Sequence, residues 1–202
     1  TAKFIHVMSN FHNPTTYSLS QDRRQAIIEL AHKYKTPLIE NDTYCDFTLE
    51  NQIKPSSLYD LTTYNNVIYL SSFTKLLGCS IRVGFLVAPD ILSDKINYSM
   101  YGYSPSEIAT ISVSSYLEKN YESVVRKTAE TLRTKRDCMV GAIKNYFPKQ
   151  THFNIPQGGF FLWVKLPNQI STENLLHESL KKGIAFLPGT CFSTDPVAKH
   201  YM

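Results

Sequence analysis

The sequence predicts an α/β fold with a mostly parallel, doubly wound sheet, followed by a small C-terminal α+β domain. In the first part, short apolar runs rich in β-formers alternate with a longer amphipathic stretch, which is the pattern of strands joined by helical crossovers. Such strands form a largely parallel sheet that is covered on both faces. After Phe147-Pro148 the pattern changes to short strands around a Gly158-Gly159 turn and one helix, which indicates the second, smaller unit.

The elements of the first part follow in order along the chain. Phe4 to Met8 has the composition of a strand. Ser18 and Gln21 have the spacing of a capping box, so we expect a helix from there to about Tyr34. The apolar side chains expected on one face of this helix are Ala26, Ile27, Leu30, Ala31 and Tyr34. Three more strands are predicted, at Thr36–Glu40, Val67–Leu70 and Val83–Ala88.

Helices predominate from about Pro105 to Tyr146. The smaller unit then has predicted strands at 151–154, 160–165 and 184–187, and a helix from Ser171 to Lys182 that Gly183 ends. Its aromatic residues Phe160, Phe161 and Trp163 are expected in its core. These limits divide the chain into a partial large domain at 1–104, a helical connection at 105–146 and a small domain at 147–202.

Composition excludes several classes of protein. The 202 residues are 43% hydrophobic and 19% charged, which suits one globular domain with an appendage. The net charge is +4, but basic and acidic residues alternate, so we expect a solvated surface and no nucleic-acid interface in this segment. The four cysteines are far apart and the histidines are scattered, so no disulfide framework and no metal site are indicated. A reducing cytoplasm fits best, with no membrane span.

Three predicted strands are followed by short polar segments. These segments are SNFHNPT at 9–15, ENDTY at 40–44 and SSFTK at 71–75. In an open α/β sheet, ligands bind beyond the carboxyl ends of the strands, where these segments meet. Taken singly, each has an ordinary structural explanation; Asn13-Pro14, for example, is a turn former. Together with Lys75 and Arg82 they indicate a binding site.

At these positions the sequence resembles a known family. The motifs NPT, DTY, SSFTK seven residues before Arg82-Val83-Gly84, and PQGGFFLWVKLP are similar to those of fold-type-I pyridoxal-phosphate enzymes of the class I/II aminotransferase group. The similarity runs over essentially the whole chain, in the order and spacing of the family. It implies pyridoxal 5′-phosphate as cofactor, an amino acid or 2-oxo acid as substrate, and a homodimer.

The resemblance also implies a role for each residue. Lys75 forms a Schiff base with the cofactor aldehyde and later moves the substrate proton, which makes it the catalytic residue. Hydroxyls and a guanidinium suit a phosphate dianion, and those groups are Ser72, Thr74 and Arg82. Asp42 pairs with the protonated pyridine nitrogen and keeps the ring an electron sink. Tyr44 and Asn13 hydrogen-bond the phenolic oxygen and tune the pKa of the Schiff base.

The chain departs from the family pattern at a few positions. Cys79-Ser80 stands where Pro-Gly is common, Thr16 where Gly follows NPT, and Asn41-Asp42 where the family has an acidic pair. The family's N-terminal third and the arginine that binds the substrate α-carboxylate have no counterpart, so we expect both ends of this segment to be cut.

Two classes of function stay open. One is an aminotransferase that moves an amino group between an amino acid and a 2-oxo acid. The other is the effector domain of a MocR-type transcription regulator of the GntR family, where the same fold binds pyridoxal phosphate behind a winged-helix DNA-binding domain. DNA is a partner only in that second case, through residues outside this chain. A flavodoxin-like or Rossmann-type domain is disfavoured because no Gly-rich loop follows the first strand.

Overall fold

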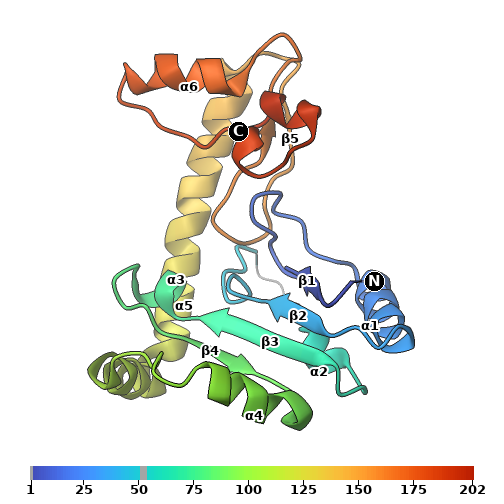
Figure 1. The fold of residues 1–202 in the computed structure, drawn as a ribbon. Helices are drawn as coiled ribbons and strands as arrows, with labels where there is room; N and C mark the ends of the chain where they lie inside the picture. The colour runs from blue at the N-terminus through green and yellow to red at the C-terminus, as the bar shows by residue number, and fades with distance from the viewer. Residues whose placement is uncertain (1, 51–53) are drawn as a thin grey trace.

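A four-stranded sheet forms the centre of the computed structural model, which describes residues 2–50 and 54–202 (Figure 1). Its strands are β1 (Ile5–Val7), β2 (Leu38–Asn41), β3 (Val67–Ser72) and β4 (Gly84–Val87), in the order β1-β2-β3-β4. The first three are parallel, and β4 pairs with β3 in the antiparallel direction. The predicted class, with a mostly parallel sheet, is therefore confirmed.

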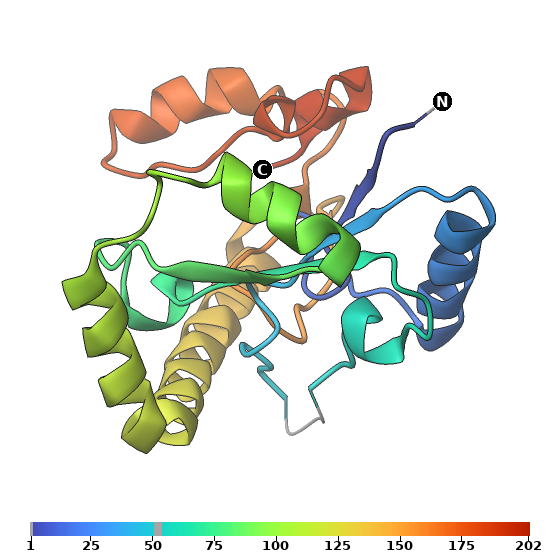
Figure 2. The same ribbon diagram turned by 60° about the horizontal axis from the view of Figure 1, so that its bottom comes forward.

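Helices surround the sheet and join it to the rest of the chain. They are α1 (Gln21–Lys33), α2 (Leu58–Leu61), α3 (Thr74–Leu77), α4 (Asp90–Ser99) and α5 (Glu107–Tyr146). In both views α1 lies at one side of the sheet, and α3 with α5 lies at the other (Figures 1 and 2). Helix α4 was not predicted from the sequence. No described helix is both long and apolar enough to cross a membrane.

The smaller unit lies at the far end of α5 (Figure 1). It contains the antiparallel strands β5 (His152–Phe153) and β6 (Val164–Lys165), helix α6 (Thr172–Leu180), and the 3-10 helices η1 (Gly189–Cys191) and η2 (Pro196–His200). Its core gathers Ile143 of α5 with Val164 and Leu166. The separate unit is confirmed as an architecture, while the limits of the three predicted segments, 1–104, 105–146 and 147–202, stay a prediction.

The face of α1 that packs on the sheet differs from the predicted one. The buried residues are Arg24, Ile28 and Ala31, whereas Leu30 and Tyr34 are 51% and 66% exposed. The buried stripe therefore includes an arginine, which a purely apolar pattern passes over. The helix also begins later than expected, with Ser20 as its N-cap. Ser18 does not cap it because its hydroxyl accepts a 3.0 Å hydrogen bond from the Phe11 amide.

Two predictions for the smaller unit are wrong. Residues 184–187 form no strand in the described structure, and Ile184 is 60% exposed, because no neighbouring strand pairs with this segment. Residues 160–163 are also outside a strand. Phe160 and Phe161 pack edge-on or tilted against Tyr44, with ring centroids 5.8 and 5.6 Å away. Of the three aromatics, Trp163 stays in the unit, stacked on Tyr201 at 5.1 Å.

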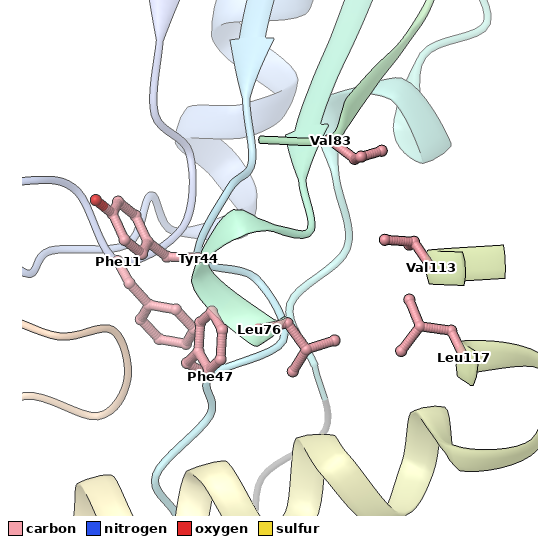
Figure 3. Close-up of a cluster of buried hydrophobic side chains, with 7 residues drawn as sticks. All are labelled: Phe11, Tyr44, Phe47, Leu76, Val83, Val113 and Leu117. Carbon is pink, nitrogen blue, oxygen red and sulfur yellow. The ribbon is translucent and has the colours of Figure 1, made fainter. Parts of the chain in front are cut away.

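One apolar cluster connects the strand ends to α5. It consists of Phe11, Tyr44, Phe47, Leu76, Val83, Val113 and Leu117 (Figure 3). Figure 3 shows the rings of Phe11, Tyr44 and Phe47 gathered on one side, with Val113 and Leu117 reaching in from α5. Each of these seven side chains is at most 9% exposed. Apolar burial of this kind contributes about 25 cal/mol per Å², so the cluster holds the segments after β1, β2 and β3 in place.

Candidate functional site

The candidate site lies where the parallel strands β1, β2 and β3 end. The register pairs Val7 with Glu40 and Asn41 with Leu70, so the three polar segments begin side by side. The ladder continues one step further, because the Asp42 amide donates a 2.8 Å hydrogen bond to the Leu70 carbonyl. The convergence expected from the sequence is therefore present.

Asp42 directly follows β2, at the predicted strand end, and is buried there. Its side chain is 1% exposed. One carboxylate oxygen accepts a 2.8 Å hydrogen bond from Asn10 Nδ2, and the other accepts one of 3.2 Å from the Tyr69 hydroxyl. Burial raises the pKa of the Asp42 carboxyl above its ordinary value, and the hydrogen bond from Asn10 opposes that rise. The carboxylate is therefore fixed by groups of the chain itself.

A buried arginine, which sequence reasoning missed, supports this arrangement. Arg24 of α1 is 2% exposed and donates to Asn10 Oδ1 at 2.6 Å and to the Ser9 carbonyl at 3.0 Å. It also donates to the carbonyls of Leu19 and Ser56. The signal in the sequence was its spacing from Ile28 and Ala31, which places all three on one helix face. Arg24 thus ties α1 to the strand ends.

Glu40 is a second buried carboxylate that sequence reasoning missed. It is fully buried and accepts hydrogen bonds from the Ser9 hydroxyl and from the amides of Leu58 and Tyr59 at 2.8 and 3.0 Å. Burial is the largest influence on its pKa and raises it above the ordinary value, while these hydrogen bonds oppose the rise. Because the Glu40 carboxylate oxygens accept from the amides of the first turn of α2, we assign Glu40 a structural role.

Lys75 and Arg82 lie on either side of the turn that follows β3. Lys75 is in α3, and both side chains are exposed. Over residues 2–50 and 54–202, neither side chain makes a hydrogen bond or an ion pair. Arg82 has a φ of 51°, in the left-handed region that a non-glycine residue rarely adopts. Leu76, the neighbour of Lys75, is buried in the apolar cluster and anchors α3. An unpaired amine and an unpaired guanidinium thus stand seven residues apart on either side of this turn.

The Ser72 hydroxyl, close to Lys75 in the chain, is held by backbone groups of Thr74 and Val83. Ser72 Oγ accepts a 3.2 Å hydrogen bond from the Thr74 amide and donates one of 3.3 Å to the Val83 carbonyl. These bonds connect the end of β3 to the residue that follows Arg82. The structure therefore joins Ser72 to the Thr74 backbone, while the binding of a phosphate by these two residues stays a prediction.

Asn13 and Tyr44 form the third part of the site. Tyr44 is 5% exposed, and burial raises the pKa of its hydroxyl, while the nearby Asn13 amide opposes the rise. Asn13 Oδ1 is buried and has no hydrogen-bond partner among the described residues. Buried amide oxygens normally have partners, so this one is an unused polar group at the site.

Chemically, the arrangement suits a phosphorylated aldehyde. A lysine amine forms an imine with an aldehyde. Hydroxyls and a guanidinium fork bind phosphate. The described residues offer all of these groups between Ser72, the last residue of β3, and Arg82, which shortly precedes β4.

Comparison with known proteins points to one family. The profile described as aminotransferase class I and II matches residues 2–199. Aromatic-amino-acid aminotransferase 1 of Thermococcus litoralis is 26% identical over 99% of this chain and 48% of that protein. The uncharacterized HTH-type transcriptional regulator YdfD of Bacillus subtilis is 28% identical over 92% of this chain and 39% of that protein.

A solved structure gives the same result at the level of fold. The α-aminoadipate aminotransferase LysN from Thermus thermophilus, complexed with N-(5′-phosphopyridoxyl)-L-leucine, matches with a TM-score of 0.90 at 26% identity. The match covers 98% of this chain and 52% of that one. This chain spans about half the length, or less, of the relatives that it matches.

Proposed function

Because the chain belongs to the aminotransferase class I and II family, we propose that its protein binds pyridoxal 5′-phosphate and transfers an amino group between an amino acid and a 2-oxo acid. The observation that carries this proposal is Lys75. It is an exposed lysine without a partner in the described structure, and it lies in α3, three residues after Ser72 and seven before Arg82.

The residues present fit this cofactor. When bound, pyridoxal phosphate supplies an aldehyde and an electron-withdrawing ring. Lys75 would hold the aldehyde carbon covalently in the resting protein, and its amine, when free of the cofactor, would move a proton at the substrate Cα. Ser72, Thr74 and Arg82 bind the phosphate through hydroxyl and guanidinium donors.

Tyr44 and Asn13 complete the proposed set of cofactor contacts. Together they hold the phenolic oxygen of the cofactor. The donors to that oxygen are the Asn13 amide nitrogen and the Tyr44 hydroxyl, since an amide oxygen can only accept. The fixed position of Tyr44 in the apolar cluster orients that contact, because its ring packs against both Phe160 and Phe161.

The assembly is proposed on the same basis. We propose a homodimer in the cytoplasm. Large apolar side chains are exposed on α4, on α5 and in the segment between them. Such a surface supports an interface with a second copy of the chain. The side chains are Tyr98, Tyr101, Tyr103, Ile108 and Ile111, which are 65% to 89% exposed.

A transcription regulator is the second candidate, and the likeness to YdfD favours it. In that case the same site senses a ligand, and a further domain binds DNA. The site residues described here are compatible with both functions, because both require cofactor binding.

One experiment tests the proposal and separates the two candidates. Full-length protein is mixed with pyridoxal phosphate and visible absorption is recorded, followed by a panel of amino acids with detection of 2-oxo acids. A visible band that amino acids abolish, with release of the matching oxo acid, supports the aminotransferase. A band that persists without oxo acid release supports the regulator, and no band at all contradicts both.

A further inference from the structure

The two faces of strand β2 present different groups at the site. Side chains alternate along a strand, so Leu38 and Glu40 point to one face and Ile39 and Asn41 to the other. We call the first the helix face, because Leu38 packs there against Ile28 of α1 and Leu58 of α2. Asp42 follows directly after β2 and continues the alternation on the face of Glu40, because its amide extends the ladder to Leu70 and its carboxylate accepts from Tyr69. Leu38 and Glu40 of β2, and Asp42 just beyond its end, are each at most 1% exposed.

The opposite face carries Ser72. In the register, Asn41 pairs with Leu70, and paired residues of neighbouring strands point to the same side. Leu70 and Ser72 are two residues apart, so Asn41, Leu70 and Ser72 share one side, which we call the Ser72 face. Ser72 belongs to the proposed phosphate site, and Asn41 and Ser72 are half-buried. The group of β2 that faces a cofactor on this side is therefore Asn41.

Asp42 is badly placed for the same task. Its carboxylate turns to the helix face, where Asn10 and Tyr69 occupy its two oxygens at 2.8 and 3.2 Å. Tyr69 pairs with Glu40 in the register, which confirms that it lies on the helix face. Asp42 is only 1% exposed, so groups of the chain itself already cover it.

The amide of Asn41 is oriented by its own chain. Its Oδ1 accepts hydrogen bonds from the Thr43 hydroxyl at 2.6 Å and from the Thr43 amide at 3.4 Å. A backbone amide can only donate, so Oδ1 faces Thr43 and Nδ2 points elsewhere. In the described part of the chain, Nδ2 has no acceptor. It is a hydrogen-bond donor left free on the Ser72 face.

We infer that Asn41, and not Asp42, is the side chain that contacts the ring nitrogen of the cofactor, and that it donates a hydrogen bond to an unprotonated nitrogen. This inference rests on the proposed function. A carboxylate favours the protonated, cationic ring, whereas a neutral amide donor favours the neutral ring. The ring is then a weaker electron sink, so this chain is built for slow transfer or for binding. Asp42 serves as a positioning residue that anchors the loop through Asn10.

Nitrogen-15 NMR of the cofactor ring tests this inference. Full-length wild type, Asn41→Asp and Asp42→Asn are each loaded with pyridoxal phosphate labelled at the ring nitrogen. We expect the wild-type resonance at the chemical shift of a neutral pyridine. Asn41→Asp should move it to the shift of a pyridinium, because a carboxylate then faces the nitrogen. Asp42→Asn, the matched control on the opposite face, should leave it unchanged.

The opposite pattern overturns the inference. A wild-type resonance at the pyridinium shift, lost in Asp42→Asn and unaffected in Asn41→Asp, assigns the contact to Asp42. The wild type and Asn41→Asp decide the matter even where Asp42→Asn fails to fold. A labelled cofactor that shows only its free resonance with all three proteins rejects the proposed function itself, and the inference with it.

Discussion

The side-chain amide of Asn10 donates a 2.8 Å hydrogen bond to the carboxylate of Asp42. Through its oxygen, the same amide accepts one of 2.6 Å from Arg24. A buried guanidinium and a buried carboxylate are thus connected by one neutral side chain, which links α1 to the ends of β1 and β2. Breaking such a link leaves buried polar groups without partners, which costs more than the hydrogen bonds themselves contribute.

The first prediction concerns this link. Asn10→Ala removes one partner from each of Arg24 and Asp42, so we expect the free energy of unfolding to fall by about 3 kcal/mol. Denaturant unfolding of the full-length protein measures this. The control is Gln25→Ala, which removes an exposed contact with Glu29 and should change stability by no more than about 0.5 kcal/mol. Equal effects of the two substitutions would show that the buried link does not stabilise the fold.

The second prediction concerns Arg82. Arg82→Ala removes the guanidinium but keeps the Cβ, so the backbone at a φ of 51° is strained to the same degree. A charged hydrogen bond contributes about 1.5–3 kcal/mol, so the affinity for pyridoxal phosphate should fall about 10- to 100-fold. The affinity for pyridoxal, which has no phosphate, should change little. A parallel loss for both compounds would mean that Arg82 does not bind the phosphate.

The third prediction concerns Cys45. Burial, with Asp42 and Asp46 nearby, raises the pKa of its thiol to about 12. Because only the thiolate is alkylated, the rate for Cys45 in the native protein should keep rising with pH well beyond the ordinary value of about 8.5. Iodoacetamide labelling followed by peptide mass spectrometry gives this rate, and the urea-unfolded protein is the control. A native rate that levels off near pH 9 is incompatible with the raised pKa.

The same raised pKa affects stability, and its sign follows from proton binding. The folded state keeps the Cys45 proton at pH values where the unfolded state loses it. The contribution is therefore fully present below about pH 8.5 and is lost as the pH rises toward about 12. Cys45→Ala should reduce the loss of unfolding free energy over this range.

Much of the fold could be predicted because its signals are local. The apolar runs marked all four strands of the sheet to within a few residues, and α6 ended before Gly183 as expected. The segment at 184–187 has the composition of a strand but no partner, and pairing is a tertiary property that a single run does not contain. The same limit explains α1, where Arg24 is buried because carbonyl groups from distant loops surround it.

The sequence predicts which residues lie at the site, but it predicts less well which way their side chains point. Sequence order placed Asp42, Ser72 and Lys75 at the strand ends, and the structure brings those ends together. Which of two adjacent residues faces the ligand depends on the phase of the strand. A shift of one residue exchanges the two faces of a strand, so Asn41 and Asp42 could be separated only by register and burial.

The central claim is that Lys75 holds the cofactor, and covalent trapping tests it most directly. Full-length protein is incubated with pyridoxal phosphate, reduced with borohydride, digested, and analysed by mass spectrometry. Lys75→Arg keeps the charge but cannot form an imine, and Lys119→Arg on the exposed side of α5 is the control. We predict a phosphopyridoxyl group on Lys75 in the wild type and in Lys119→Arg, and none in Lys75→Arg. A label on another lysine, or a label that persists in Lys75→Arg, would contradict the account.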